Sequence, residues 1–278
     1  METQLIEVAP NIEEKRQEII DKLQSGEMVL SFSAIKEFAK SPAHFMAYKL
    51  GDKKQTAAMK KGTMIHCAIL EPEELEKRYC ILEPSMLPNP DKDFRNTENK
   101  NFKAEFEAKA ASENKEIIDP VEWRNLIAHR DLAYNNEVIS PYLNNLIKRE
   151  NYAEWDFAGF HWRGVRDGVG KSYVLDLKTV ADATPDKVSR FIAQQEKYHW
   201  QQFLYKQAPD VSPFYTSFNL LVDADMGISM FEISWSKLAQ AESELIRLLD
   251  KFKMCIDQNL WHQNYEFWSD NTKGYFEI

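Results

Sequence analysis

Apolar residues in the first half of the chain recur at the three- and four-residue spacing of amphipathic helices. Serine residues precede the second helical pattern, and Pro42 opens the third, where proline is tolerated in the first turn. The stretch 84–102 holds three prolines among polar residues and is predicted to be a loop. Helices are predicted over residues 11–25, 31–40, 42–50 and 57–70, with two or three more between about 103 and 149.

A strand-like pattern begins near residue 150 and later alternates with helical patterns. The predicted strands are Tyr152–Phe157, Phe160–Asp167, Tyr173–Thr179, Phe214–Val222 and Ile228–Ile233, and the predicted helices are 185–207 and 236–260. This order predicts one α/β domain over 1–278, with a mixed sheet flanked by helices. Residues 1–149 would form its mainly helical portion, and 150–278 would carry the sheet.

Composition limits the class of protein. The 278 residues are 44% hydrophobic, which is enough for a substantial core. A net charge of −9 argues against nonspecific coating of nucleic acid, so a DNA enzyme would need its basic groups gathered in one channel. No apolar run approaches the roughly 20 residues of a membrane span, and residues 1–7 lack the basic start of a signal peptide, so we expect a cytoplasmic protein. Three cysteines without a CxxC pair give no support for a zinc ribbon or an iron–sulfur cluster.

Two charged residues, Asp176 and Lys178, stand in a predicted strand that also contains Leu175 and Leu177. A buried strand seldom contains both an acid and an amine, because unpaired charge is costly away from water. A divalent cation held by carboxylates, with an ammonium beside it, would compensate both groups, as in metal-dependent nucleases. The alternative is an ordinary Asp–Lys ion pair on an exposed hairpin.

The turn before this strand indicates where a second carboxylate lies. A four-residue loop over 170–173 would place Asp167 directly opposite Asp176, with Cβ atoms roughly 5 Å apart. Carboxylates that close repel each other unless a proton or a cation lies between them. Mg²⁺ suits oxygen ligands, so the pair predicts a Mg²⁺ site, with Mn²⁺ as a substitute metal. A one-residue slip in the register would turn Asp167 to the other face.

Several motifs occur in an order that resembles a known family. They are Gly62-x-x-x-His66, Asp167, Asp176-Leu177-Lys178-Thr179 and Gln201-x-x-x-Tyr205, preceded by the helical entry Ser31–Pro42. Over roughly residues 30–210 the chain resembles the PD-(D/E)xK nuclease superfamily, in particular its RecB-like and RecE-like (exodeoxyribonuclease VIII) branch. One departure is Arg166, which stands where the family name has proline.

The resemblance implies a restriction-endonuclease-like fold and a metal-dependent deoxyribonuclease. The implied activity is a 5′-to-3′ exonuclease acting on linear double-stranded DNA ends in phage or prophage recombination. A ring-shaped homo-oligomer and a single-strand annealing protein as partner are implied as well. The implied catalytic residues are Asp167, Asp176, Lys178 and Gln201, and the implied metal ligands are His66, Asp167, Asp176 and the Leu177 carbonyl oxygen.

Residues for DNA contact are suggested by charge and by aromatic character near the proposed site. The candidates are Arg163, Arg166, Lys171 and Tyr198, and the resemblance implies Tyr205 as a further one. Glu154, on the first predicted strand, is a further acidic candidate, although a solvated strand residue explains it as well. Three other functions stay open: an endonuclease of restriction or repair on the same fold, a non-catalytic DNA-binding protein, and an interaction protein whose motifs match by chance.

Overall fold

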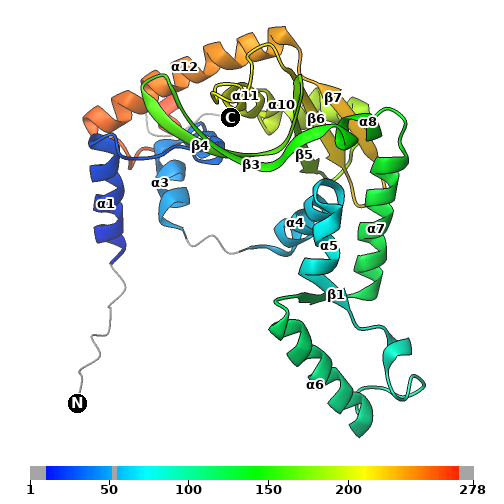
Figure 1. Cartoon of the computed structure of the whole chain (residues 1–278). Coiled ribbons are helices and arrows are strands. Elements are labelled where there is room, and N and C mark those ends of the chain that lie inside the picture. The colour runs from blue at the N-terminus through cyan, green and yellow to red at the C-terminus, as the bar shows by residue number, and fades with distance from the viewer. Residues whose placement is uncertain (1–10, 52–54, 269–278) are drawn as a thin grey trace, which may run out of the picture.

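The computed structural model describes residues 11–51 and 55–268 (Figure 1). Within them, no helix is both long and apolar enough to cross a membrane. The helices are α1 (Ile12–Gln24), α2 (Phe32–Phe38), α3 (Pro42–Leu50), α4 (Ala57–Leu70), α5 (Pro72–Arg78), α6 (Thr97–Ser112), α7 (Pro120–Asn135), α8 (Ser140–Asn144), α9 (Pro185–Lys187), α10 (Ala193–Gln195), α11 (Tyr198–Tyr205) and α12 (Trp235–Gln258). The strands are β1 (Tyr79–Ile81), β2 (Glu116–Ile118), β3 (Leu146–Phe157), β4 (Phe160–Gly170), β5 (Tyr173–Thr179), β6 (Thr216–Val222) and β7 (Ile228–Glu232).

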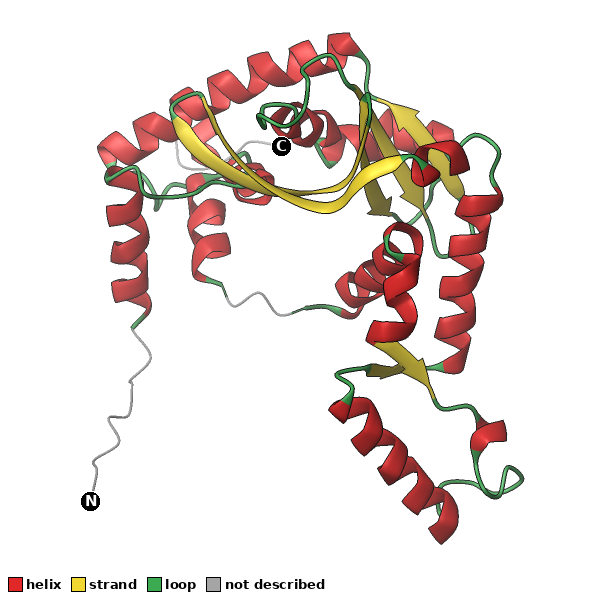
Figure 2. Cartoon of the chain, in the orientation of Figure 1, coloured by secondary structure: helices red, strands yellow, loops and turns green. Residues whose placement is uncertain are grey.

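The main sheet has five strands in the order β3-β4-β5-β6-β7. Only β5 and β6 run parallel, and the chain between them carries α9, α10 and α11. The other neighbours are antiparallel hairpins, so the predicted mixed sheet flanked by helices is confirmed. Figure 2 shows the helices on both sides of this sheet.

The β4–β5 hairpin has the register expected from the four-residue loop. Gly168 pairs with Leu175 and Val169 with Val174, which is the register that sets Asp167 against Asp176. The ladder between the two strands stops there. Pairing between β5 and β6 continues to Thr179, so the end of β5 stays fixed in the sheet.

The long β3–β4 hairpin turns at Ala158 and Gly159, whose φ values of 51° and 80° are those of a two-residue turn with both central residues left-handed. The hairpin is curved, with α11 and α12 on its concave side and α4 beyond the opposite side (Figure 1). Because Phe157 pairs with Phe160 at the turn, the register along the whole ribbon follows from this loop.

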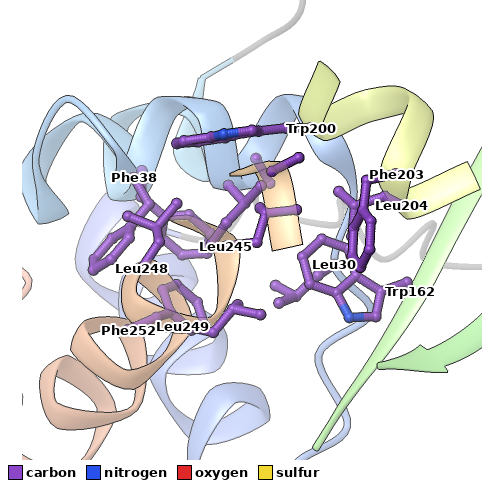
Figure 3. Close-up of a cluster of buried hydrophobic side chains, with 14 of the residues drawn as sticks. Leu30, Phe38, Trp162, Trp200, Phe203, Leu204, Leu245, Leu248, Leu249 and Phe252 are labelled. Atoms are coloured by element: carbon purple, nitrogen blue, oxygen red, sulfur yellow. The ribbon is translucent and has the colours of Figure 1, made fainter. Parts of the chain in front are cut away.

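Two apolar layers hold the sheet between helices. On one side, Trp162 and Val174 pack with residues of α2, α3, α11 and α12, and Phe252 of α12 meets Phe38 edge-on with ring centroids 4.8 Å apart (Figure 3). On the other side, Leu175 and Leu177 pack against α4 and α7. Alternate residues of β5 therefore bury both of its faces, which explains its nearly continuous apolar sequence.

Three predictions about elements need correction. The predicted helix 185–207 is interrupted: a π-helical turn, Val188–Ile192, follows α9, and Lys197 adopts a left-handed conformation (φ 56°) before α11. The predicted loop 84–102 ends earlier, because α6 starts at Thr97. The first sheet strand starts at Leu146 rather than Tyr152.

The segment from β1 to β2 forms a small unit that the sequence does not predict. Its two strands pair in parallel, α6 packs beside them, and the unit projects from the body below α5 and α7 (Figures 1 and 2). Strands of three residues have no measurable periodicity, which is why the pattern of the sequence did not reveal them.

Candidate active site

Helix α4 reaches the end of β5 because it carries a glycine at the point of contact. A Cβ atom on Gly62 would lie 3.1 Å from the Thr179 hydroxyl oxygen, which is tighter than ordinary packing. The missing side chain lets the helix lie against the strand. One turn later on the same helix, His66 points toward the sheet, with its Nδ1 atom 3.7 Å from the Asp167 carboxylate.

Asp167 lies where β4 and β5 separate. Its Oδ2 atom accepts a hydrogen bond from the Leu177 backbone N–H at 2.6 Å. The side chain thus takes over a backbone donor that the β4 main chain no longer pairs, and it is itself buried. Leu177 contributes its N–H to this contact; its carbonyl oxygen as a metal ligand stays a prediction.

A third ligand group comes from β3. Glu150 Oε1 lies 3.9 Å from His66 Nδ1, and one ligand atom from each of His66, Glu150 and Asp167 lies within 4.8 Å of the other two. Carboxylate oxygens suit Mg²⁺ and Mn²⁺, and an imidazole nitrogen is a common ligand of divalent transition metals. On the chemistry of these donors, the three residues fit a divalent cation.

Asp176 lies beside this group with both carboxylate oxygens engaged. Oδ1 accepts from Gln201 Nε2 at 3.0 Å, and Oδ2 accepts from Asn219 Nδ2 at 3.1 Å and pairs with Lys178 Nζ at 2.7 Å. Gln201 Nε2 also lies 2.8 Å from the Tyr205 hydroxyl. The predicted residues Asp176, Lys178, Gln201 and Tyr205 therefore form one connected network.

The site shifts the proton affinities of its members. Burial, reinforced by the negative charge of Asp176, raises the pKa of Asp167 to about 7. Burial alone would lower the pKa of His66, but its contacts with Glu150 and Asp167 outweigh this and raise it. Burial likewise opposes the charge of Lys178, yet Asp176 and Asp167 raise its pKa above the ordinary value. Without a cation the site therefore retains protons that a cation would displace.

Two cavities meet at Lys178 and Thr179. One of about 740 Å³ is lined by His66, Glu150 and other residues of α4 and α5. The other, of about 570 Å³, is lined by residues of α2 and by Tyr198 and Gln201. The candidate groups are thus reachable from two sides of the end of β5. A separate, mainly apolar cavity of about 640 Å³ between α6 and the β1–β2 pair contains none of the candidate site residues.

The residues predicted to contact DNA lie in different parts of the structure. Arg163 is exposed on β4, and Tyr198 is buried but lines the second cavity. Lys171 is exposed in the turn before β5, at the opposite end of that strand from Lys178, roughly 20 Å away by strand length. Lys171 therefore lies outside the site.

Arg166 and Tyr205 are corrections. The structure contradicts the prediction that Arg166 contacts DNA, because its side chain is fully buried and pairs with Asp210 at 2.7 Å and with Asn151. A buried guanidinium needs such partners in the interior. Tyr205 is also buried and packs over Gly164, so it supports Gln201 instead of facing a ligand.

Glu150 is the residue that the sequence analysis missed, since the strand was expected to start at Tyr152. The register that the β3–β4 turn sets could have identified it. Pairing Phe157 with Phe160 and counting back along both strands places Glu150 opposite Asp167, between the observed pairs Arg149–Gly168 and Asn151–Arg166. Glu154, the acidic candidate named instead, lies farther out and bonds Tyr152 and His161.

Comparison with known proteins agrees with this geometry. Residues 31–270 match the family described as a PDDEXK-like domain of unknown function (DUF3799). A protein of Eubacterium rectale called a "putative exonuclease" has a similar structure, with a TM-score of 0.57 and 11% identity over 93% of this chain and 88% of that chain. An alkaline exonuclease from Laribacter hongkongensis aligns over 60% of this chain and 85% of that chain at 15% identity, but its TM-score of 0.31 carries no argument. No curated protein matches the chain. The family match and the first alignment confirm the predicted fold class.

Proposed function

Because the chain belongs to the family of PDDEXK-like domains, we propose that it is a metal-dependent deoxyribonuclease that degrades linear double-stranded DNA from its ends. One observation carries the proposal. The network of Asp176, Lys178 and Gln201 and the group of His66, Glu150 and Asp167 converge at the end of β5, where two cavities meet. An ordinary surface ion pair does not require this convergence.

The residues divide the chemistry of phosphodiester hydrolysis among them. A divalent cation held by His66, Glu150 and Asp167, with Asp176 and the Leu177 carbonyl oxygen as further candidate ligands, would act as a Lewis acid toward the scissile phosphate. Lys178 supplies a compact positive charge for the oxygens on which negative charge develops.

Positioning of the lysine depends on a chain of hydrogen bonds. Asp176 holds the Lys178 ammonium, Gln201 holds Asp176, and Tyr205 contacts Gln201 from the buried side. Asn219 fixes the second oxygen of Asp176. A lysine held in this way reaches the cavities with its orientation already set, which reduces the reorganisation needed during the reaction.

The E. rectale protein has a similar fold, and its name is that of an exonuclease. This name supports an action on the ends of the duplex, and not within it. The alternative is an endonuclease on the same fold. Incubation with Mg²⁺ of linear duplex labelled separately at its 5′ and 3′ termini, alongside covalently closed circular duplex, separates the two. We expect loss of label from linear DNA and an intact circle; cutting of the circle at a similar rate would show the endonuclease.

The matched control for this assay is Lys22→Ala beside Lys178→Ala. Lys22 is an exposed lysine of α1 that pairs with Glu18 and lines neither of the two cavities at Lys178. We expect Lys22→Ala to keep full activity and Lys178→Ala to lose it. Binding of DNA without any cleavage by the wild-type protein under these conditions would favour the non-catalytic alternative.

Finer properties follow from the resemblance and are part of the proposal. They are 5′-to-3′ polarity, a ring-shaped homo-oligomer and supply of single strands to an annealing protein in phage-type recombination. The order in which the two end labels are released tests polarity. Sedimentation of the purified protein with and without duplex DNA tests the ring, because a monomer under both conditions would exclude it.

A further inference from the structure

The outer face of the β3–β4 ribbon continues beyond the candidate metal ligands. Tyr152 and Val165 form a directly opposed pair, two residues farther along each strand than Glu150 and Asp167. Alternation places these pairs on the same face of the ribbon. The residues between them, Asn151 and Arg166, turn inward and bond each other. Tyr152 and Val165 are 54% and 41% exposed, so an aromatic ring and an aliphatic side chain stand open beside the site.

The exposed ring is held in place although it lies on the surface. The Tyr152 hydroxyl donates to Glu154 Oε1, and His161 contacts Glu154 Oε2 at 3.2 Å and Asp156 Oδ1 at 2.9 Å. Surface tyrosines without such partners lose more conformational freedom when they bind a ligand. This network uses the polar end of Tyr152 and leaves the ring face available.

The size and charge of the surface around Tyr152 indicate which kind of group its ring binds. Two apolar side chains are far fewer than a protein interface of about 800 Å² per partner needs. Glu154 lies directly beyond Tyr152, but its cross-strand partner Arg163 offsets its charge, and Lys178 at the site attracts a phosphate. A flat, uncharged group linked to a phosphate fits both neighbours, and a nucleobase is such a group.

We propose that the ring of Tyr152, with Val165 beside it, is a stacking platform for the base of a nucleotide next to the phosphate that is cut. This inference rests on the proposed function and adds a substrate contact to it. The step of two residues from Glu150 to Tyr152 is roughly 7 Å, a distance that one nucleotide spans between its phosphate and its base. Aromatic stacking accepts any base, so the platform binds DNA without selecting its sequence.

The test combines a protein change with a DNA change. Tyr152→Ala should raise KM for linear duplex about 5- to 150-fold, the range for loss of one stacked base. An abasic nucleotide at one of the first three positions from the degraded end should give the wild-type protein a similar loss. The KM of Tyr152→Ala should be the same for the intact duplex and for the duplex with that abasic position. Tyr152→Phe, which keeps the ring, should stay within a few-fold of wild type.

The matched control is Phe214→Ala, which removes a ring that is 82% exposed in the segment before β6, at the end of the sheet opposite Lys178. We expect its KM to be unchanged. Equal activity of Tyr152→Ala and wild type would overturn the inference. So would additive losses from Tyr152→Ala and the abasic nucleotide at all three positions, because independent losses mean that the ring and the base do not meet.

A binding measurement separates this inference from the proposed function. Duplexes with 2-aminopurine at each of the first three positions from the end are titrated into the Lys178→Ala protein, with and without the additional change Tyr152→Ala. Quenching that disappears with Tyr152 supports the platform even if the wild-type protein cuts no DNA, in which case only the proposed function fails. Quenching that is equal in both proteins overturns the platform even where cleavage is normal.

Discussion

Replacing Asp167 by asparagine should stabilise the protein in the absence of divalent cations, although it removes a candidate ligand. Burial and the charge of Asp176 raise the pKa of Asp167 to about 7 from 3.8. A group whose pKa is higher in the folded than in the unfolded state favours folding at low pH, and this contribution is lost as the pH rises through 7. Above that pH the folded protein holds an ionised carboxylate that its surroundings disfavour.

The magnitude follows from the difference between the two pKa values. The conversion is about 1.4 kcal/mol for each tenfold change in proton affinity. A folded-state pKa of about 7, compared with 3.8, therefore lowers the free energy of unfolding, relative to an uncharged side chain, by about 4 kcal/mol at pH 8 and about 2 kcal/mol at pH 5.5. Asparagine carries no charge, and its side-chain oxygen can still accept the N–H of Leu177 that Asp167 accepts now. These values are upper limits, because Lys178 and His66 also respond to the change.

Urea unfolding in the presence of a chelator measures the difference directly. We expect Asp167→Asn to exceed the wild type in free energy of unfolding, by a gap that grows between pH 5.5 and pH 8. Addition of Mn²⁺ at pH 8 should reverse the order, because only the wild type gains stability from the cation. A gap that is constant with pH, or a less stable Asp167→Asn protein at pH 8, would refute the argument that this carboxylate is held against its preferred state.

Two further predictions concern the same region. His66→Ala and Glu150→Gln should each weaken Mn²⁺ binding at least about 10-fold in calorimetry, since each removes one of three ligand groups; an unchanged affinity would remove that residue from the ligand set. Arg166→Met should lower the free energy of unfolding by about 1–2 kcal/mol, because it removes the hydrogen bonds to Asn151 and Asp210, while Asp210 keeps its ion pair with Lys148. Its DNA affinity, compared by anisotropy under folding conditions, should match the wild type, and a selective loss of DNA binding would restore Arg166 as a contact residue.

Much of the sheet could be predicted because its signals are local. The strand Tyr173–Thr179 has the predicted bounds, and the loop before it gave the register that opposes Asp167 and Asp176. Turn chemistry and alternation act over a few residues, so they can be read directly from the sequence. The same holds for helix α4, which ends before Pro72 as expected.

The residues that were predicted wrongly, or not predicted at all, depend on contacts between distant segments. Arg166 looked like a free cation because its partner Asp210 lies 44 residues later. Glu150 joined the site only after the ribbon had been extended back past Tyr152, and Lys197 breaks a helix in a stretch without glycine or proline. Tertiary contacts determine the conformation and partners of each of these residues, and the local propensity of the sequence does not predict such contacts.

The central claim is that Asp176 and Lys178 act together at a metal-dependent site. Release of acid-soluble nucleotides from linear duplex, measured with Mg²⁺ and then with chelator, tests it most directly in the wild type, Asp176→Ala and Lys178→Ala. We predict cation-dependent release by the wild type and a loss on the order of 10²–10³-fold or more in both variants, with unchanged circular dichroism. Release at the wild-type rate by either folded variant would contradict the account.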